Sequence, residues 1–217
     1  MMLGAAGLCF VIFLATIAFV FDGTNVVTHV AAEFDRSISL SLAHFREHGP
    51  TGRMVEVSAL GSPVVVVIFA IVMGVELLES RDWLGFAHLT TALLGASLLS
   101  RLLQHVWDRP RPETLLPYLV VTKGSFPSAH LFGAAACYST FAFFYARYAG
   151  RRATEIAAQV LAALLVVLIG STRVYLGAHH TTDVIAGIAG GWAWGLLVAA
   201  LFSLWYRDPP AVRPATR

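Results

Sequence analysis

Polar residues able to carry out chemistry gather in three short segments of an otherwise apolar chain. The candidate site residues are, in chain order, Gln104, Arg109, Arg111, Ser128, His130, Arg173, His179 and Asp183. Ionisable groups are costly close to a bilayer and commonly mark functional sites. We therefore interpret the three segments as parts of one polar site.

The arginines and the serine of this set predict a phosphate-binding site. The guanidinium groups of Arg111 and Arg173 have the fork geometry that matches phosphate oxygens. A helix that begins directly after Ser128 would point its first backbone N–H groups at the same anion.

The histidines predict a nucleophile and an acid. His179 and Asp183 are four residues apart, so one helical turn places them on the same side. A carboxylate there can hold one imidazole nitrogen and leave the other free to attack phosphorus. His130 lies on another segment and can protonate the leaving group. His180, next to His179, is the competing nucleophile. A zinc site formed by His130, His179 and Asp183 is the alternative, but it leaves the arginines unexplained.

Six apolar runs must position this site. Of 217 residues, 57% are hydrophobic and 13% are charged, which is typical of a membrane protein. The net charge of +2 gives no reason to expect nucleic acid as a partner. A span needs about 20 apolar residues. The runs are residues 3–21, 63–78 (beginning near Met54, with a bend at Gly61 and Pro63), 83–103, 131–148, 156–170 and 184–206.

The predicted fold is therefore an all-α bundle of six membrane helices in a single domain, residues 1–217. Three longer segments, residues 22–62, 104–130 and 171–183, share one face and carry the site. The first of them also predicts an amphipathic helix, which ends before Gly49-Pro50 and lies in the membrane interface. Its apolar stripe is Val27, Val30, Phe34, Ile38, Leu42 and Phe45. Gly187, Gly191 and Gly195 predict a close helix–helix contact.

Orientation follows from the basic residues outside the site. The two sides carry similar numbers until Arg109, Arg111, Lys123 and Arg173 are set aside as functional, and then more remain on the side of the termini. The positive-inside rule places the termini in the cytoplasm. We expect an integral protein of the bacterial cytoplasmic (inner) membrane, with its site on the outer (periplasmic) face.

The three segments resemble the signature of the type 2 phosphatidic acid phosphatase superfamily, over about residues 83–191. That signature reads Lys-x6-Arg-Pro, then Pro-Ser-Gly-His, then Ser-Arg-x5-His-x3-Asp. The matching residues here are Arg111-Pro112, Pro127-Ser128-Ala129-His130, and Arg173, His179 and Asp183. Three positions depart from it: Gln104 stands for the lysine, Ala129 for the glycine and Thr172 for the serine. Arg109 and Lys123 are the candidates to replace the missing charge.

The resemblance implies metal-independent hydrolysis of a phosphate monoester or pyrophosphate on a membrane lipid, with no cofactor. His179 would form a phosphohistidine, Asp183 would orient it, and His130 would act as acid and then base. The remaining residues, Arg111, Arg173, Ser128 and Gln104, would hold the phosphoryl oxygens.

The implied partners are the bilayer and a lipid phosphate: phosphatidic acid, phosphatidylglycerol phosphate or undecaprenyl pyrophosphate. A lipid phosphotransferase with the same site is one alternative. A weakly active lipid-phosphate-binding protein is another, because Gln104 replaces the lysine. No feature of the sequence indicates an oligomeric state.

Overall fold

The computed structural model describes residues 2–23, 25–46, 49–113, 124–149 and 152–206, and in these residues the only regular elements are helices. This part of the chain confirms the all-α class. The helices are α1 (Met2–Phe21), α2 (Asn25–Arg46), α3 (Thr51–Ala59), α4 (Pro63–Glu79), α5 (Trp83–Trp107), α6 (Ala129–Ala149), α7 (Arg152–Tyr175) and α8 (Thr181–Ser203).

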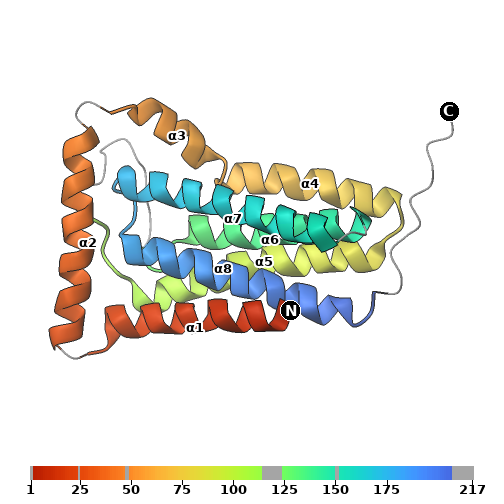
Figure 1. Cartoon of the computed structure of the whole chain (residues 1–217), viewed down its shortest axis with the longest axis horizontal. Helices are drawn as coiled ribbons and strands as arrows, with labels where there is room; N and C mark the ends of the chain where they lie inside the picture. Colours follow the sequence, from red (N-terminus) through yellow and green to blue (C-terminus); the bar gives the residue numbers. More distant parts are fainter. Residues whose placement is uncertain (1, 24, 47–48, 114–123, 150–151, 207–217) are drawn as a thin grey trace.

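The bundle is formed by helices that run side by side, α1, α4, α5, α6, α7 and α8, and α2 lies across one of its ends (Figure 1). The described parts of the three long connections, including α2 and α3, are at that same end. The turn between α4 and α5 is at the opposite end. The arrangement agrees with the expectation that the longer segments share one face.

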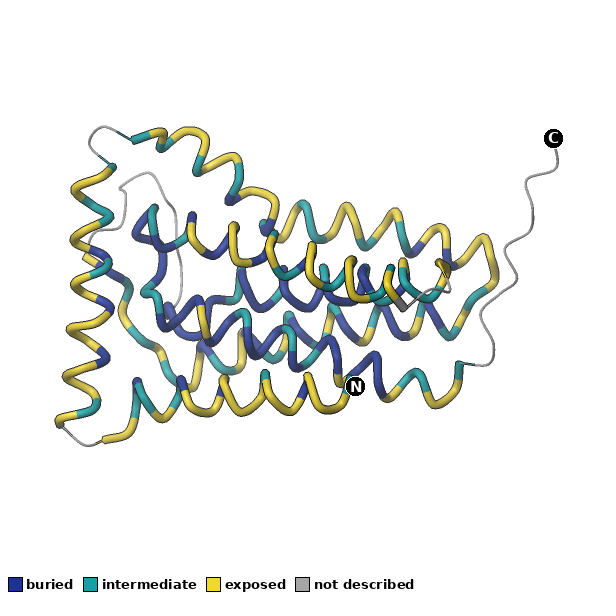
Figure 2. Tube along the Cα trace, in the orientation of Figure 1, coloured by how far each residue is buried: buried dark blue, intermediate teal, exposed yellow. Residues whose placement is uncertain are grey.

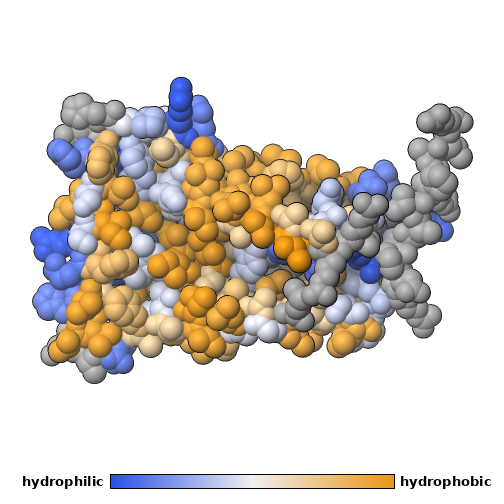
Figure 3. Space-filling view, in the orientation of Figure 1, coloured by the Kyte–Doolittle hydropathy of each residue, from blue (hydrophilic) through white to orange (hydrophobic). Residues whose placement is uncertain are grey.

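Five stretches in the described part of the chain are long and apolar enough to cross a membrane: Met2–Phe21, Thr51–Glu79, Trp83–Trp107, Ala153–Tyr175 and Thr181–Ser203. Apolar side chains form a broad belt over the bundle, between the more polar α2 end and the end where α8 finishes (Figure 3). α6, which covers the predicted run 131–148, is not one of the five. Together with α8 it forms the buried centre of the bundle (Figure 2).

Local sequence explains where the helices begin and end. The predicted bend at Gly61 and Pro63 separates α3 from α4. Ser62 caps α4 by accepting a hydrogen bond from Val65 N at 3.3 Å, and Pro63 occupies the first turn. α7 and α8 extend beyond their predicted apolar runs to include Arg173 and Asp183. Both are polar motif residues that an apolar pattern alone leaves outside a helix.

The predicted amphipathic helix is present as α2, and it ends at Arg46, before Gly49-Pro50. Its buried face coincides only in part with the apolar stripe, of which Ile38 and Leu42 pack against the core. Ala31, Asp35 and Ser39, each four residues apart, are buried against the bundle. Val30 and Phe45 of the stripe are 55% and 67% exposed. A buried carboxylate on this face requires polar partners, which the site provides.

α8 packs closely against α6 through the three predicted glycines. A Cβ built on Gly187 would lie 2.7 Å from the carbonyl oxygen of Ser128, and one on Gly191 or Gly195 would overlap α6 at Phe132 or Ser139. The prediction of a small-residue contact is confirmed. This contact joins the second and third polar segments.

Candidate active site

The beginnings of α6 and α8 lie together and bring two of the three motif segments to one point. The backbone N–H of Ser128 donates to the carbonyl oxygen of Asp183 at 3.0 Å. The helix predicted after Ser128 is confirmed as α6, which begins at Ala129. Ser128 is its N-cap, and its hydroxyl accepts a hydrogen bond from Leu131 N at 3.4 Å. The hydroxyl proton of Ser128 therefore stays available for an anion.

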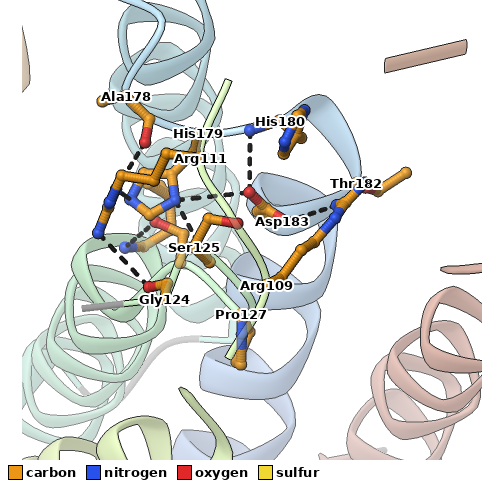
Figure 4. Close-up of polar contacts among 12 residues, drawn as sticks. Arg109, Arg111, Gly124, Ser125, Pro127, Ala178, His179, His180, Thr182 and Asp183 are labelled. Atoms are coloured by element: carbon orange, nitrogen blue, oxygen red, sulfur yellow. Dashed lines mark hydrogen bonds and ion pairs between the residues drawn. The ribbon is translucent and has the colours of Figure 1, made fainter. Parts of the chain in front are cut away.

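His179 is at the centre of the site and is 3% exposed (Figure 4). Its Nδ1 lies 3.0 Å from the carbonyl oxygen of Ser125, and its Nε2 lies 3.3 Å from Nη1 of Arg111. Because a carbonyl oxygen only accepts and a guanidinium only donates, Nδ1 carries the proton and the lone pair of Nε2 faces Arg111 as an acceptor. This is the tautomer that a nucleophilic Nε2 requires.

Asp183 is buried beside His179, but its closest partners are other groups. Its Oδ2 accepts from the backbone N–H of His180 at 2.9 Å and lies 3.7 Å from Nδ1 of His179. Its Oδ1 accepts from Nη1 of Arg109 at 2.7 Å. The charge of Asp183 therefore acts on His179 through space, while Ser125 makes the direct hydrogen bond to Nδ1.

Burial lowers the pKa of His179 to about 4. The negative charge of Asp183 opposes this effect, and the positive charges of Arg173 and Arg111 add to it. Burial also lowers the pKa of Arg111, while the charge of Asp183 raises it. His179 is therefore neutral near pH 7, as a nucleophile must be.

Two arginines line the site from different elements. Arg111 donates to the carbonyl oxygen of Ala178 at 2.6 Å, which directs its guanidinium toward His179 (Figure 4). Arg173 donates from Nη1 to Oγ of Ser58 at 3.2 Å. Its buried Nε has no hydrogen-bond partner among the described residues. An unpartnered buried donor beside a second guanidinium is well suited to a phosphate oxygen.

His130 lies on the first turn of α6 and faces α3. Its Nε2 donates to the carbonyl oxygen of Ser58 at 2.9 Å, since that oxygen only accepts. Ser58 therefore holds both His130 and Arg173, one through its backbone and the other through its hydroxyl. α3 covers this side of the site.

Three residues bear on the missing lysine: Gln104, which stands at its position, and Arg109 and Lys123, the candidates to replace its charge. α5 continues through Gln104, whose buried side chain donates to the carbonyl oxygen of Pro127 at 3.0 Å, directly before Ser128. Arg109 is directed at two carboxylates, those of Asp183 and Asp35. Lys123 lies outside the described residues.

The sequence did not predict four residues that contact the site residues: Asp35, Ser58, Ser125 and Thr182. Ser58 and Ser125 act partly through backbone carbonyl groups, which carry no residue-type signal. Asp35 did carry a signal, because it is an acidic residue spaced four residues from the small residues Ala31 and Ser39. That spacing marks a helix face that packs closely around one charge.

His180, the residue after His179, is the N-cap residue of α8. Its Nε2 lies 3.3 Å from the carbonyl oxygen of Pro110, and its ring points away from His179 (Figure 4). Within the described ranges, no group of three or more His, Cys, Asp or Glu side chains is arranged to hold a metal ion. The geometry gives the proposed zinc alternative no support.

Known proteins share this architecture. The structure is similar to the crystal structure of the PAP2-type phosphatidylglycerolphosphate phosphatase of Bacillus subtilis, with a TM-score of 0.80 and 26% identity, over 93% of this chain and 98% of that one. The chain is 28% identical over 174 residues to phosphatidylglycerophosphatase B of the same organism, covering 79% of this chain and 82% of the relative.

A second group of relatives has a different substrate in its name. The chain is 35% identical over 132 residues to lipid A 1-phosphatase of Rhizobium etli, across 56% of this chain. It spans about half the length of that relative, 52%. The family model of the PAP2 superfamily matches residues 84–207, which include all three motif segments. The chain belongs to the PAP2 superfamily.

Proposed function

We propose that this protein hydrolyses a phosphate monoester or pyrophosphate group on a membrane lipid, without a metal ion, through a phosphohistidine on His179. The observation that carries the proposal is the geometry of His179. Its Nδ1 faces the Ser125 carbonyl at 3.0 Å, so Nε2 presents a lone pair beside the guanidinium of Arg111. A neutral imidazole next to fixed positive charge is suited to attack a bound phosphoryl group.

The reaction proceeds in two balanced steps. Nε2 of His179 forms a bond to phosphorus as the bond from phosphorus to the leaving oxygen breaks, and His130 gives that oxygen a proton. His130 then takes a proton from water, which attacks phosphorus and breaks the P–N bond. Inorganic phosphate leaves in both cases; the lipid product is an alcohol when the substrate is a monoester and a lipid monophosphate when it is a pyrophosphate.

The cradle for the phosphoryl oxygens consists of Arg111, Arg173 and the hydroxyl of Ser128. The two guanidinium groups come from different elements, and the buried Nε of Arg173 is an unused donor among the described residues. Two fixed cations supply the charge stabilisation that a metal ion provides in other phosphatases. Gln104 is neutral, and it supports this cradle through its hydrogen bond to the Pro127 carbonyl.

In the membrane we propose that the single domain spans six times. The six spans are the five long apolar stretches and α6, which is the fourth in chain order. α6 is enclosed by its neighbours and needs less apolar surface of its own. α2 would lie in the interface, with Val30 and Phe45 toward lipid. The termini would be cytoplasmic, and the site would face the outer side of a bacterial inner membrane.

The test is phosphate release by the purified protein from phosphatidic acid, phosphatidylglycerol phosphate, undecaprenyl pyrophosphate and lipid A 1-phosphate, each with and without EDTA. The last substrate is included because of the relatives' names. We expect release from at least one lipid, unchanged by EDTA, and an acid-labile phosphoenzyme that is absent from His179→Ala. Tight binding without turnover would instead favour a lipid-phosphate-binding protein. Transfer to an added lipid alcohol without release would favour a phosphotransferase.

A further inference from the structure

Asp35 of α2 is buried at the active site although it belongs to none of the three motif segments. The residue is 1% exposed, and its carboxylate is surrounded by hydrogen-bond donors. Oδ1 accepts from the backbone N–H of Thr182 at 3.0 Å, and Oδ2 accepts from the hydroxyl of Thr182 at 2.5 Å. Oδ2 also accepts from Nη2 of Arg109 at 2.8 Å.

The same donors connect Asp35 to Asp183. Arg109 uses Nη2 for Asp35 and Nη1 for Asp183, at 2.8 and 2.7 Å. Nη1 also donates to the hydroxyl of Thr182 at 2.8 Å. One guanidinium therefore joins two buried carboxylates, one from α2 and one from α8.

Thr182 is in the first turn of α8, where backbone N–H groups have no partner within the helix. Asp183 caps the N–H of His180 from within α8, and Asp35 caps the N–H of Thr182 from α2. The position of the turn that carries Asp183 thus depends on a residue from another helix.

The charges of this group have a consequence for His179. Arg109 with Asp183 alone would be a neutral pair, whereas two carboxylates around one guanidinium leave a net negative charge. That charge lies on the Nδ1 side of His179, where positive charge develops as Nε2 attacks phosphorus.

We propose that Asp35 is a positioning residue for the reaction: through Arg109 and Thr182 it fixes the orientation of Asp183 and preserves the negative charge beside the nucleophile. The inference rests on the proposed function. It also makes α2 part of the catalytic apparatus, although α2 contributes no atom that contacts the phosphoryl group.

The test compares Asp35→Asn with Asp35→Glu and the matched control Glu33→Gln. Asparagine replaces one acceptor oxygen by an NH₂ group that faces only donors, whereas glutamate keeps the charge. Glu33 is on the same helix, but its side chain is 61% exposed and pairs with Arg36 at 3.9 Å. We expect Asp35→Asn to lower kcat by roughly 10- to 100-fold with KM nearly unchanged. Asp35→Glu should recover part of the loss, and Glu33→Gln should match the wild type.

Inhibition by inorganic phosphate, which occupies the cradle without forming a bond to His179, separates positioning from substrate binding. Because Asp35 does not reach the phosphate cradle, the inhibition constant should be the same in Asp35→Asn and the wild type. A constant that rises together with KM would overturn the inference, and so would a wild-type kcat in Asp35→Asn. An inactive wild type and an inactive Glu33→Gln on every lipid would instead overturn the proposed function, and this inference with it.

A double-mutant cycle with Arg109 covers the case in which Asp35→Asn folds poorly. Arg109→Gln should cost less activity in the Asp35→Asn background than in the wild type, because the two groups act as a unit. Activities are compared per folded protein, judged by elution from a sizing column. Additive losses would contradict the coupling.

Discussion

The Nδ1 atom of His179 lies 3.0 Å from the carbonyl oxygen of Ser125 and 3.7 Å from Oδ2 of Asp183. The backbone therefore sets the tautomer of His179, while the carboxylate supplies charge at a longer distance. This division of roles explains how Asp183 can also pair with Arg109 and cap α8 without releasing the orientation of His179.

The first prediction separates the two adjacent histidines. His179→Ala should lower kcat by at least roughly 10⁴-fold, because the proposed mechanism transfers the phosphoryl group to this side chain. His180→Ala should lose less than about tenfold, since that ring contacts the Pro110 carbonyl and points away from His179. Lipid phosphatase assays on both variants are the measurement. Equal, small losses at both positions would contradict the assignment of His179.

The second prediction concerns pH. Because burial lowers the pKa of His179 to about 4, its neutral, nucleophilic form persists well below the ordinary value of about 6.5. The ¹⁵N signals of the His179 ring, assigned by comparison with His179→Ala, should remain those of a neutral imidazole down to about pH 4. Activity limited by this group should be lost only on further acidification. A midpoint near 6.5 would contradict this picture.

The third prediction concerns Gln104, the position of the family lysine. Arg109 is engaged by two carboxylates, so it is poorly placed to replace that charge. A lysine at 104 can keep the bond to the Pro127 carbonyl and add a charged contact near the phosphate, worth about 1.5–3 kcal/mol. Gln104→Lys should raise turnover at least roughly tenfold, and Gln104→Ala should lower it. No gain with lysine would show that the cradle is complete without a third cation.

The fourth prediction concerns the glycine contact between α6 and α8. A Cβ on Gly187 would lie 2.7 Å from the Ser128 carbonyl and 3.1 Å from Leu131 Cβ, so α6 must move away from α8. Gly187→Ala should lower both thermal stability and activity. Gly133→Ala on α6 is the matched control, because its added Cβ meets nothing within 4 Å. Similar losses in the two variants would indicate a general effect of replacing glycine in these helices.

The sequence predicted the elements of this fold more completely than the contacts between them. Apolar runs located the helices, and Gly61 with Pro63 marked the break between α3 and α4. The apolar stripe of α2 indicated a helix, but it did not indicate which face is buried. A carboxylate with long-range partners overrides the apolar pattern there, and such partners become visible only in three dimensions.

In the site, too, the sequence predicted the residues better than their contacts. The spacing of His179 and Asp183 correctly indicated that they lie close together, but the expected shared helical turn is wrong, because His179 lies before α8. The spacing also did not indicate that Ser125 lies nearer to Nδ1. The predicted roles of Arg111, Arg173, Ser128, His130 and Gln104 remain predictions about the chemistry. Arg109 pairs with Asp35, which is 74 residues away in the chain, and no local sequence pattern indicates such a pairing.

Ser58 has a consequence for the departure of product. In the resting site its carbonyl oxygen accepts from His130 and its hydroxyl accepts from Arg173. Under the proposed mechanism, an arriving phosphate group competes with Ser58 for these two donors. A dephosphorylated lipid has a single hydroxyl oxygen and competes far less well, so Ser58 regains both donors once phosphate leaves. We therefore expect inorganic phosphate to inhibit the enzyme more strongly than the lipid alcohol it produces.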